Sequence, residues 1–217
     1  MPLTISIITT ILLVITIILL SYKSYLGITK STYNGYQNTV IGYKTMLDTW
    51  FEENNTLIRT YSITPSIINY LVGVRTDEEN TALINTLKQF ESINKYSLDI
   101  GVTDINGTIL QNSKNVNIGR NIKETFTGVW ENFIANNYDT AYGTDILKST
   151  ISNNMIFTIM AGVKTNGNLI GTIYMVLNWN ALFEKLQKLK LVETGRLFAI
   201  NNKRNIMLNT QNKYSSK

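Results

Sequence analysis

An uncharged apolar segment near the N-terminus is the feature that most restricts how this chain can fold. Residues 3–20 contain only Leu, Ile, Val, Thr and Ser, and the first charged side chain is Lys23. About 20 apolar residues span the hydrocarbon core of a bilayer, and the backbone there must satisfy its hydrogen bonds within the segment. We therefore predict a transmembrane helical anchor over residues 1–22.

A cleaved signal peptide is the alternative interpretation of this segment. Such a peptide needs a basic stretch before the apolar run and a small-residue cleavage site after it. No Lys or Arg precedes the run, and Ser21-Tyr22-Lys23 is not an A-x-A site. Both observations favour an uncleaved anchor.

An amphipathic pattern continues after the anchor and predicts one long helix over residues 23–61. Its apolar positions alternate at spacings of three and four residues, with one position skipped at Asn54. They are Tyr33, Tyr36, Val40, Tyr43, Leu47, Trp50, Leu57 and Tyr61. Such a stripe packs either on a sheet of the same chain or on the helix of a second copy. We expect intrachain packing, together with a homodimer contact through this helix near the membrane.

The absence of Cys and His removes several classes of function. It excludes disulfides, Cys-His and Ser-His catalysis and nearly all zinc sites. The net charge of +5 is scattered, with no basic run longer than Lys203-Arg204, so no nucleic-acid footprint is present. Asp139 and Asp145 lack a third ligand and make a poor metal site. We expect no cofactor, no metal site and no catalytic residue.

The apolar pattern changes its period in the second half of the chain. From Leu98 to Thr103 apolar and polar residues alternate, which is typical of a strand, and Asn106-Gly107 predicts a hairpin turn. Before this point, Thr64-Pro65 and the capping box Thr76 to Glu79 predict two helix starts. The further predicted elements are a return strand (108–112), a helix (121–134), a loop or edge strand (138–148), strands (155–163 and 169–179) around a turn at 165–168, and a helix (180–191). This order predicts an α+β domain with one antiparallel sheet that the long helix covers.

The C-terminal residues repeat the opening of the sheet. A strand over 196–200, a turn and a return strand over 206–209 match the pattern that begins at residue 99. Two strands alone are marginally stable. We therefore interpret residues 191–217 as an incomplete second module of a truncated chain.

The order and spacing of these segments resemble a known family, the double-Cache (dCache, PAS-like) extracellular sensor domain of bacterial methyl-accepting chemotaxis proteins and sensor kinases. The sequences that carry the resemblance are DINGTILQNS at 104–113, GRNIKETFTG at 119–128, VKTNGNLIGTIYMVLNW at 163–179 and TGRLFAINNKRNIMLNT at 194–210. The resemblance implies a PAS-like Cache fold with a membrane-distal module at 62–190 and the start of a membrane-proximal module at 191–217.

The resemblance also implies a function and a location. It implies extracytoplasmic sensing of a small molecule by a transmembrane receptor for chemotaxis or signal transduction, in the inner (cytoplasmic) membrane with the sensor domain outside. The positive-inside rule disagrees, because Lys23, Lys30 and Lys44 follow the anchor. The alternatives are the sensor region of a histidine kinase or diguanylate cyclase, and a membrane-anchored surface or structural protein.

Five residues are candidates for the ligand site. By resemblance, Thr172 and Tyr174 point from the last strand into the pocket, and Tyr138 and Tyr142 lie on the loop that covers it. Arg120 has the geometry to clamp a carboxylate with two hydrogen bonds. The alternative readings are an ordinary buried tyrosine at Tyr174, solvated tyrosines on the loop and a solvated arginine in a turn.

Two departures bear on the identity of the ligand. Amino-acid-binding members have an Arg followed by aromatic residues, and an Asp on the strand after the second hairpin. In this chain Arg120 is followed by Asn121 and Ile122, and Val176 occupies the position aligned with that Asp. The resemblance therefore does not imply amino-acid sensing here.

Overall fold

The computed structural model describes residues 2–126, 128–149, 152–188, 198–200 and 206–209, with side chains described from residue 13 to residue 186. The helices are α1 (Pro2–Ser62), α2 (Pro65–Val72), α3 (Asp77–Ile93), α4 (Ile122–Thr125), α5 (Val129–Ala135) and α6 (Trp179–Lys188). The strands are β1 (Ser97–Thr103), β2 (Ile109–Asn112), β3 (Thr140–Tyr142), β4 (Leu147–Lys148), β5 (Met155–Thr165), β6 (Asn168–Asn178), β7 (Phe198–Ile200) and β8 (Ile206–Asn209). Backbone contacts divide the chain into two units, residues 1–49 and residues 50–217.

The first unit is the N-terminal part of α1. The predicted helix over 23–61 is confirmed as part of α1, which Gly27, Gly35 and Gly42 do not interrupt. All apolar side chains from Leu13 to Leu26 are exposed. Among the helices in the described ranges, α1 is the one that is long and apolar enough to cross a membrane.

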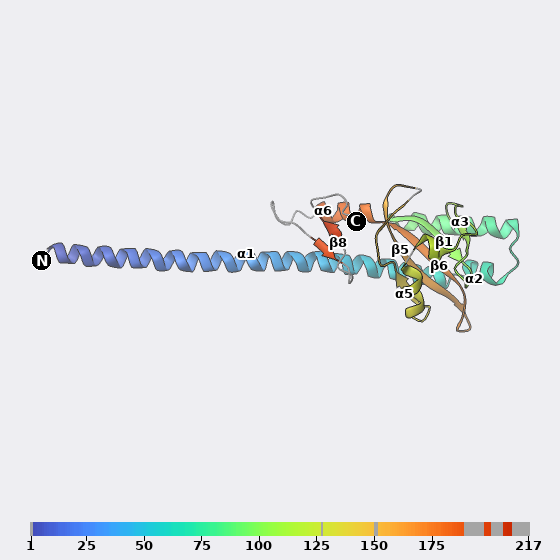
Figure 1. Cartoon of the computed structure of the whole chain (residues 1–217), viewed down its shortest axis with the longest axis horizontal. Coiled ribbons are helices and arrows are strands. Elements are labelled where there is room, and N and C mark those ends of the chain that lie inside the picture. Colours follow the sequence, from blue (N-terminus) through green and yellow to red (C-terminus); the bar gives the residue numbers. More distant parts are fainter. Residues whose placement is uncertain (1, 127, 150–151, 189–197, 201–205, 210–217) are drawn as a thin grey trace. The chain divides into compact units, whose positions relative to one another are not determined.

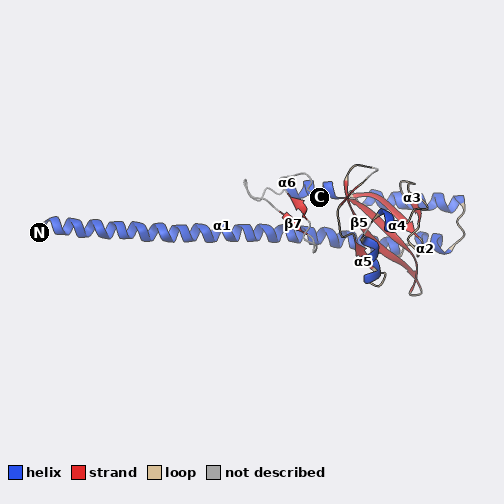
Figure 2. Cartoon of the chain, in the orientation of Figure 1, coloured by secondary structure: helices blue, strands red, loops and turns tan. Residues whose placement is uncertain are grey.

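The second unit is built on an antiparallel sheet, and the predicted α+β class is confirmed. The strand order is β2-β1-β6-β5-β3, and β4 also pairs with β5. In Figure 1 the strands β1, β5 and β6 lie between α3 and α5, and Figure 2 shows the same strands in red. The predicted turn at 165–168 joins β5 to β6, and both Asn166 and Gly167 have positive φ, as a tight hairpin of this kind requires.

The long β5–β6 hairpin separates two layers of side chains. On one face Tyr174 and Val176 of β6 pack in an apolar cluster with side chains of α4 and α5. Successive residues of a strand point to opposite faces. Ile156 of β5 belongs to this cluster, so the next residue, Phe157, packs on the other face. Its ring centroid lies 6.4 Å from that of Trp50 in α1. The sheet therefore has one face toward α4 and α5 and another toward the C-terminal end of α1.

A buried polar link joins α1 to the centre of the sheet. The Asn94 side-chain amide donates to Asn54 Oδ1 of α1 at 2.6 Å and contacts Met175 Sδ of β6 at 3.5 Å. Asn94 Oδ1 accepts from the Tyr96 backbone N–H at 3.0 Å, and Asn54 Nδ2 donates to the Trp50 carbonyl at 2.7 Å. Asn54, the skipped position of the predicted stripe, is thus buried on the stripe itself, between Trp50 and Tyr61. From Trp50 onward the helix packs within the chain, as predicted, but the fully buried residue is Ile58, while Leu57 of the predicted stripe is half-buried.

Several local predictions were right and one was wrong. The capping box is present, because Thr76 Oγ1 accepts from the Glu79 N–H and Glu79 Oε2 accepts from the Thr76 N–H. The single helix predicted over 121–134 is wrong: α4 and α5 are separate. α4 ends at Thr125 with Phe126 as its C-cap, and Gly128, in a left-handed conformation (φ 86°), is the N-cap of α5, with its N–H bonded to Glu131. The predicted tail strands pair as β7 and β8, while their turn and most residues of the proposed second module lie outside the described residues.

Replacing Asn94 with Ala should weaken the fold. The change removes the hydrogen bonds to Asn54 and Tyr96 and leaves Asn54 Oδ1 buried without this donor, which costs about 1–3 kcal/mol. Urea unfolding of the detergent-solubilised chain, followed by tryptophan fluorescence, measures the change in the free energy of unfolding. Asn85→Ala on the exposed face of α3 is the matched control. Equal stabilities of the two variants would contradict the role given to Asn94.

Candidate functional site

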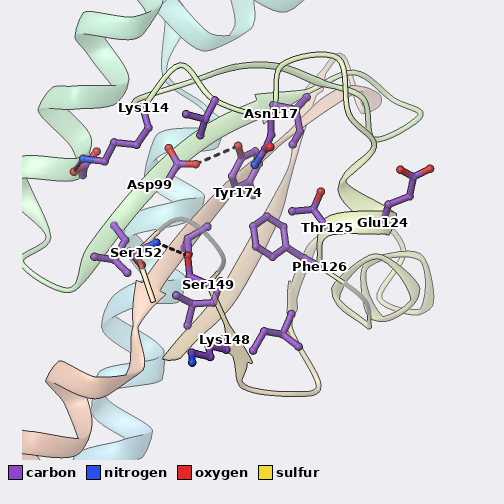
Figure 3. Close-up of a pocket in the computed structure, with 17 residues that line it drawn as sticks. Asp99, Lys114, Asn117, Glu124, Thr125, Phe126, Lys148, Ser149, Ser152 and Tyr174 are labelled. Carbon is purple, nitrogen blue, oxygen red and sulfur yellow. Dashed lines mark hydrogen bonds and ion pairs between the residues drawn. The ribbon is translucent and has the colours of Figure 1, made fainter. Parts of the chain in front are cut away.

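A cavity of about 540 Å³ opens on the face of the sheet that is turned away from α1. It is lined by residues of β1, β2, β5 and β6, by Glu91 of α3, by the segments around α4 and β4, and by the loop that follows β2 (Figure 3). Apolar side chains form most of the wall, among them Leu98, Ile109, Val116, Phe126, Ile156 and Val176. A mostly apolar hollow with a few polar groups is the usual form of a small-molecule site.

Tyr174 is the aromatic residue at the centre of the wall. Its side chain is 1% exposed, and its hydroxyl accepts from Asn112 Nδ2 at 3.2 Å and donates to Asp99 Oδ2 at 3.4 Å. Burial and the neighbouring Asp99 charge raise the pKa of the phenol well above its usual value. The hydroxyl therefore stays protonated and remains a donor.

Gly101 of β1 makes room for this ring. It pairs with Tyr174 across the two strands, and a Cβ added at Gly101 would lie 2.4 Å from the Tyr174 hydroxyl oxygen. Any side chain at this position would push the ring out of its place. The absence of a side chain at residue 101 thus fixes where the phenol sits in the cavity.

Two carboxylates form an acidic end of the cavity beside Tyr174. Ser113 Oγ lies 2.5 Å from Glu91 Oε2 and 2.9 Å from Asp99 Oδ1, and it also accepts from the Ile100 backbone N–H. Lys114 forms an ion pair with Glu91. In Figure 3 the Asp99 carboxylate points toward Tyr174, while Lys114 extends away from it.

The pKa of Asp99 is raised to about 6. Burial is the main cause, and the nearby Glu91 charge adds to it; the hydrogen bond from Ser113 and the charge and backbone N–H of Lys114 act in the opposite direction. At neutral pH Asp99 is therefore mostly ionised, and it gains a proton within the mildly acidic range. Perturbed carboxyl groups of this kind concentrate at functional sites.

The opposite side of the cavity has a different character. Lys148, Ser149 and Ser152 line it, and Lys148 is exposed to solvent. Ser149 and Ser152 are joined by a hydrogen bond from the Ser152 N–H at 3.1 Å (Figure 3). No arginine is among the described residues that line the cavity.

The structure places the five candidate residues of the sequence in different environments. Tyr174 lines the cavity, as the sequence predicted. Thr172 lies on the same strand face, two residues before Tyr174, but it is fully buried and its hydroxyl lies 2.6 Å from the Thr103 hydroxyl. Only Tyr174 of the five is therefore positioned to touch a molecule in this cavity.

The other three candidates lie away from the cavity. Arg120 is exposed in the loop before α4, Tyr138 stacks edge-on against Phe133, and Tyr142 contacts Phe51 of α1. They are not among the residues that line the cavity. Their binding roles remain predictions.

Sequence reasoning did not select Asp99 and Glu91. Asp99 was visible as a charged residue in an alternating strand, on the same face as Gly101 and Thr103. Glu91 lies near the end of α3, and no pattern in the sequence marked it as a site residue. The two carboxylates are linked through the Ser113 hydroxyl, which the turn after β2 places between them.

Comparison with known proteins identifies the fold. No protein-family model matches the sequence, and no curated protein matches it significantly. Among solved structures, the sensor domain of the Vibrio cholerae histidine kinase DctB aligns with a TM-score of 0.68 at 12% identity, over 84% of this chain and 68% of that one. The ligand-binding domain of the Pseudomonas aeruginosa PAO1 amino acid chemoreceptor PctC, in complex with GABA, aligns with a TM-score of 0.56 at 16% identity, over 76% of this chain and 69% of that one.

A third structure agrees with these two. The ligand-binding domain of the Campylobacter jejuni chemoreceptor Tlp3, in complex with 4-methylisoleucine, aligns with a TM-score of 0.53 at 21% identity, over 76% of this chain and 64% of that one. These domains share the Cache-type, PAS-like fold, and this chain has that fold too. The resemblance drawn from the sequence is confirmed at the level of the fold.

Replacing Gly101 with Ala should destabilise the fold and close part of the cavity. The added methyl group meets the buried Tyr174 ring, and overpacking of this kind costs about 1–3 kcal/mol. Gly35→Ala is the matched control, because a Cβ there meets no atom within 4 Å and improves the propensity of α1. Thermal unfolding of both variants measures the difference. A Gly101→Ala chain as stable as the Gly35→Ala chain would show that Tyr174 is not held where we place it.

Proposed function

We propose that this chain is the small-molecule sensing region of a transmembrane signalling receptor. In this proposal residues 1–22 anchor it in the inner membrane, residues 62–190 form the membrane-distal sensor module outside the cytoplasm, and residues 191–217 begin a membrane-proximal module. The observation that carries the proposal is the position of the cavity. It lies on one face of a sheet whose other face packs on α1, the helix that contains the candidate membrane span.

Strand β6 connects these two faces. Tyr174 and Val176 line the cavity, and Met175 between them contacts Asn94, which in turn bonds Asn54 of α1. A ligand that moves β6 by a small amount therefore acts on α1 through a short chain of buried contacts. A ligand shifts such an equilibrium only by its difference in affinity for the two positions, so the contacts to Tyr174 and Val176 must differ between them.

The comparisons support sensing rather than catalysis. The similar structures are sensor or ligand-binding domains, one from a histidine kinase and two from chemoreceptors, and two of them hold small molecules. Both kinds of output are compatible with this fold, so a methyl-accepting, kinase or diguanylate cyclase output is equally open to a receptor built on this sensor. We favour chemotaxis or related signal transduction over a surface or structural role because of the cavity.

A homodimer through α1 is part of the same proposal. Tyr22, Tyr25, Tyr33 and Tyr36 are all exposed on this helix. Tyrosine suits an interface that is partly wet, since its ring is apolar and its hydroxyl is polar. Two α1 helices packed side by side would join two sensor modules in one receptor.

A cavity-filling variant tests the proposed function. The purified chain is screened by thermal shift against amino acids, small carboxylates, amines and purines. A compound at a hundred times its Kd contributes about 2.7 kcal/mol, which raises the Tm of a chain of this size by roughly 5–10 °C. Val176→Phe fills the cavity and should abolish the shift.

The control for this experiment is Val74→Phe, because Val74 is exposed and lies outside the cavity. It should retain the full shift of the wild-type chain. A screen without any stabilising compound, or a compound that stabilises Val176→Phe as much as the wild type, would contradict small-molecule sensing at this site.

A further inference from the structure

We propose that the ligand is a primary monoamine with an apolar body and no carboxylate beside its amino group, bound with its ammonium against Asp99. This inference rests on the proposed function and names the ligand class of the same cavity. It follows from three properties of the acidic end: its shortage of hydrogen-bond donors, its charge, and the apolar wall next to it.

The acidic end has too few donors for its carboxylates. The Ser113 hydroxyl carries one proton, yet its oxygen lies within hydrogen-bond distance of both Glu91 and Asp99. It can donate to only one of them at a time. Besides this shared proton, Asp99 receives the Lys114 backbone N–H and, at a long 3.4 Å, the Tyr174 hydroxyl. An ammonium carries three N–H donors and supplies what this end of the cavity lacks.

The charge of the acidic end calls for one further cation. Glu91 of α3 and Asp99 of β1 are two negative groups, and Lys114, which follows β2, is the one positive group that pairs with them among the described residues. Lys114 pairs directly with Glu91 and its charge also acts on Asp99, so one positive group faces two carboxylates and one negative charge is left over. Glu124 of α4 and Lys148 of β4 also line the cavity, but both are exposed to water. A single ammonium therefore neutralises the acidic end.

The rest of the cavity fits a hydrocarbon body. Ile109, Phe126 and Val176 lie on the walls beside Asp99 and Tyr174. Burial of each CH₂ group against such walls is worth about 0.8 kcal/mol, so a short branched alkyl chain adds affinity without any polar contact.

A carboxylate next to the amino group fits poorly. In an α-amino acid the two groups are joined through one carbon, so an ammonium at Asp99 places the carboxylate beside Glu91 and Asp99 as well. Lys114 is the cation within reach and already pairs with Glu91. A clamp of the kind that arginine gives is not available, because no arginine is among the described residues that line the cavity.

The protonation of Asp99 makes binding depend on pH. The ammonium binds the ionised carboxylate, and the pKa of Asp99 lies at about 6. As the pH falls through this value, Asp99 gains a proton and loses its charge, so amine affinity falls. Bound amine favours the ionised form and therefore lowers the pKa of Asp99.

Four probes that share one carbon skeleton test the inference. They are 3-methylbutan-1-amine, the alcohol 3-methylbutan-1-ol, the acid 3-methylbutanoate and L-leucine, which is the same amine with an α-carboxylate. Titration calorimetry of the full chain in detergent at pH 7.5 gives each Kd. Since hydrogen bonds to charged groups are about twice as strong as neutral ones, the amine should bind about 10- to 100-fold tighter than each of the other three.

Variants of the chain separate this inference from the proposed function. Asp99→Asn should weaken binding of the amine about 10- to 100-fold, leave the alcohol unchanged, and remove the loss of amine affinity below pH 6. Glu124→Gln is the matched control inside the same cavity and should change the amine Kd less than about threefold, because an exposed charge is screened. Lys114→Met removes the competing cation and should strengthen amine binding, which gives a second readout if Asp99→Asn folds poorly.

The outcomes are distinct. If the alcohol or L-leucine binds as tightly as the amine, or Glu124→Gln costs as much as Asp99→Asn, the monoamine inference is overturned while small-molecule binding at the cavity stands. If none of the four probes binds, the inference is also overturned, and the proposed function is then decided by the broader screen with Val176→Phe.

Discussion

The alternation of side chains along β6 is the constraint on which the rest of the structure depends. Strand β6 lies inside the sheet between β1 and β5, and its residues from Gly171 to Leu177 are buried. Tyr174 and Val176 line the cavity, while Met175, which points to the opposite face, contacts Asn94 in the layer beneath α1. Because β6 is paired with β1 on one side and β5 on the other and carries side chains of both layers, a shift of the strand displaces both sets of side chains. A register shift by one residue would exchange the two sets of side chains.

The polar groups at the two faces have different physical roles. Beneath α1, Asn54 and Asn94 are buried and satisfied by each other and by the backbone, so they fix the position of the helix. At the cavity, Asp99 has a shared hydroxyl proton from Ser113, the Lys114 backbone N–H and one long hydrogen bond from Tyr174, and burial raises its pKa. A structural polar group is normally satisfied in the folded chain. Asp99 is better explained as a group whose missing partner comes from solution.

Local features could be predicted from the sequence, and long-range ones could not. The turn at Asn166-Gly167 and the capping box at Thr76 follow from the chemistry of a few adjacent residues. The alternation on β6 put Thr172 and Tyr174 on one face of the strand, and the resemblance to the family assigned that face to the pocket, which Tyr174 lines. The register of β1 on β6 has no local signal, so the approach of Asp99 to Tyr174 was missed. Arg120 was a candidate because it can clamp a carboxylate, and Tyr142 because of its place on the loop. In the structure Arg120 is exposed to solvent and Tyr142 contacts Phe51 of α1.

Amide hydrogen exchange of the chain with and without a bound compound tests the link between cavity and helix most directly. The compound is the one that stabilises the wild-type chain most in the thermal-shift screen. We expect exchange to change both in β6 and in residues 50–62 of α1, and we expect the change in α1 to be lost in Asn94→Ala while the compound still binds. A change confined to β6 and the walls of the cavity, with α1 unaffected in the wild-type chain, would contradict transmission from the cavity to the helix.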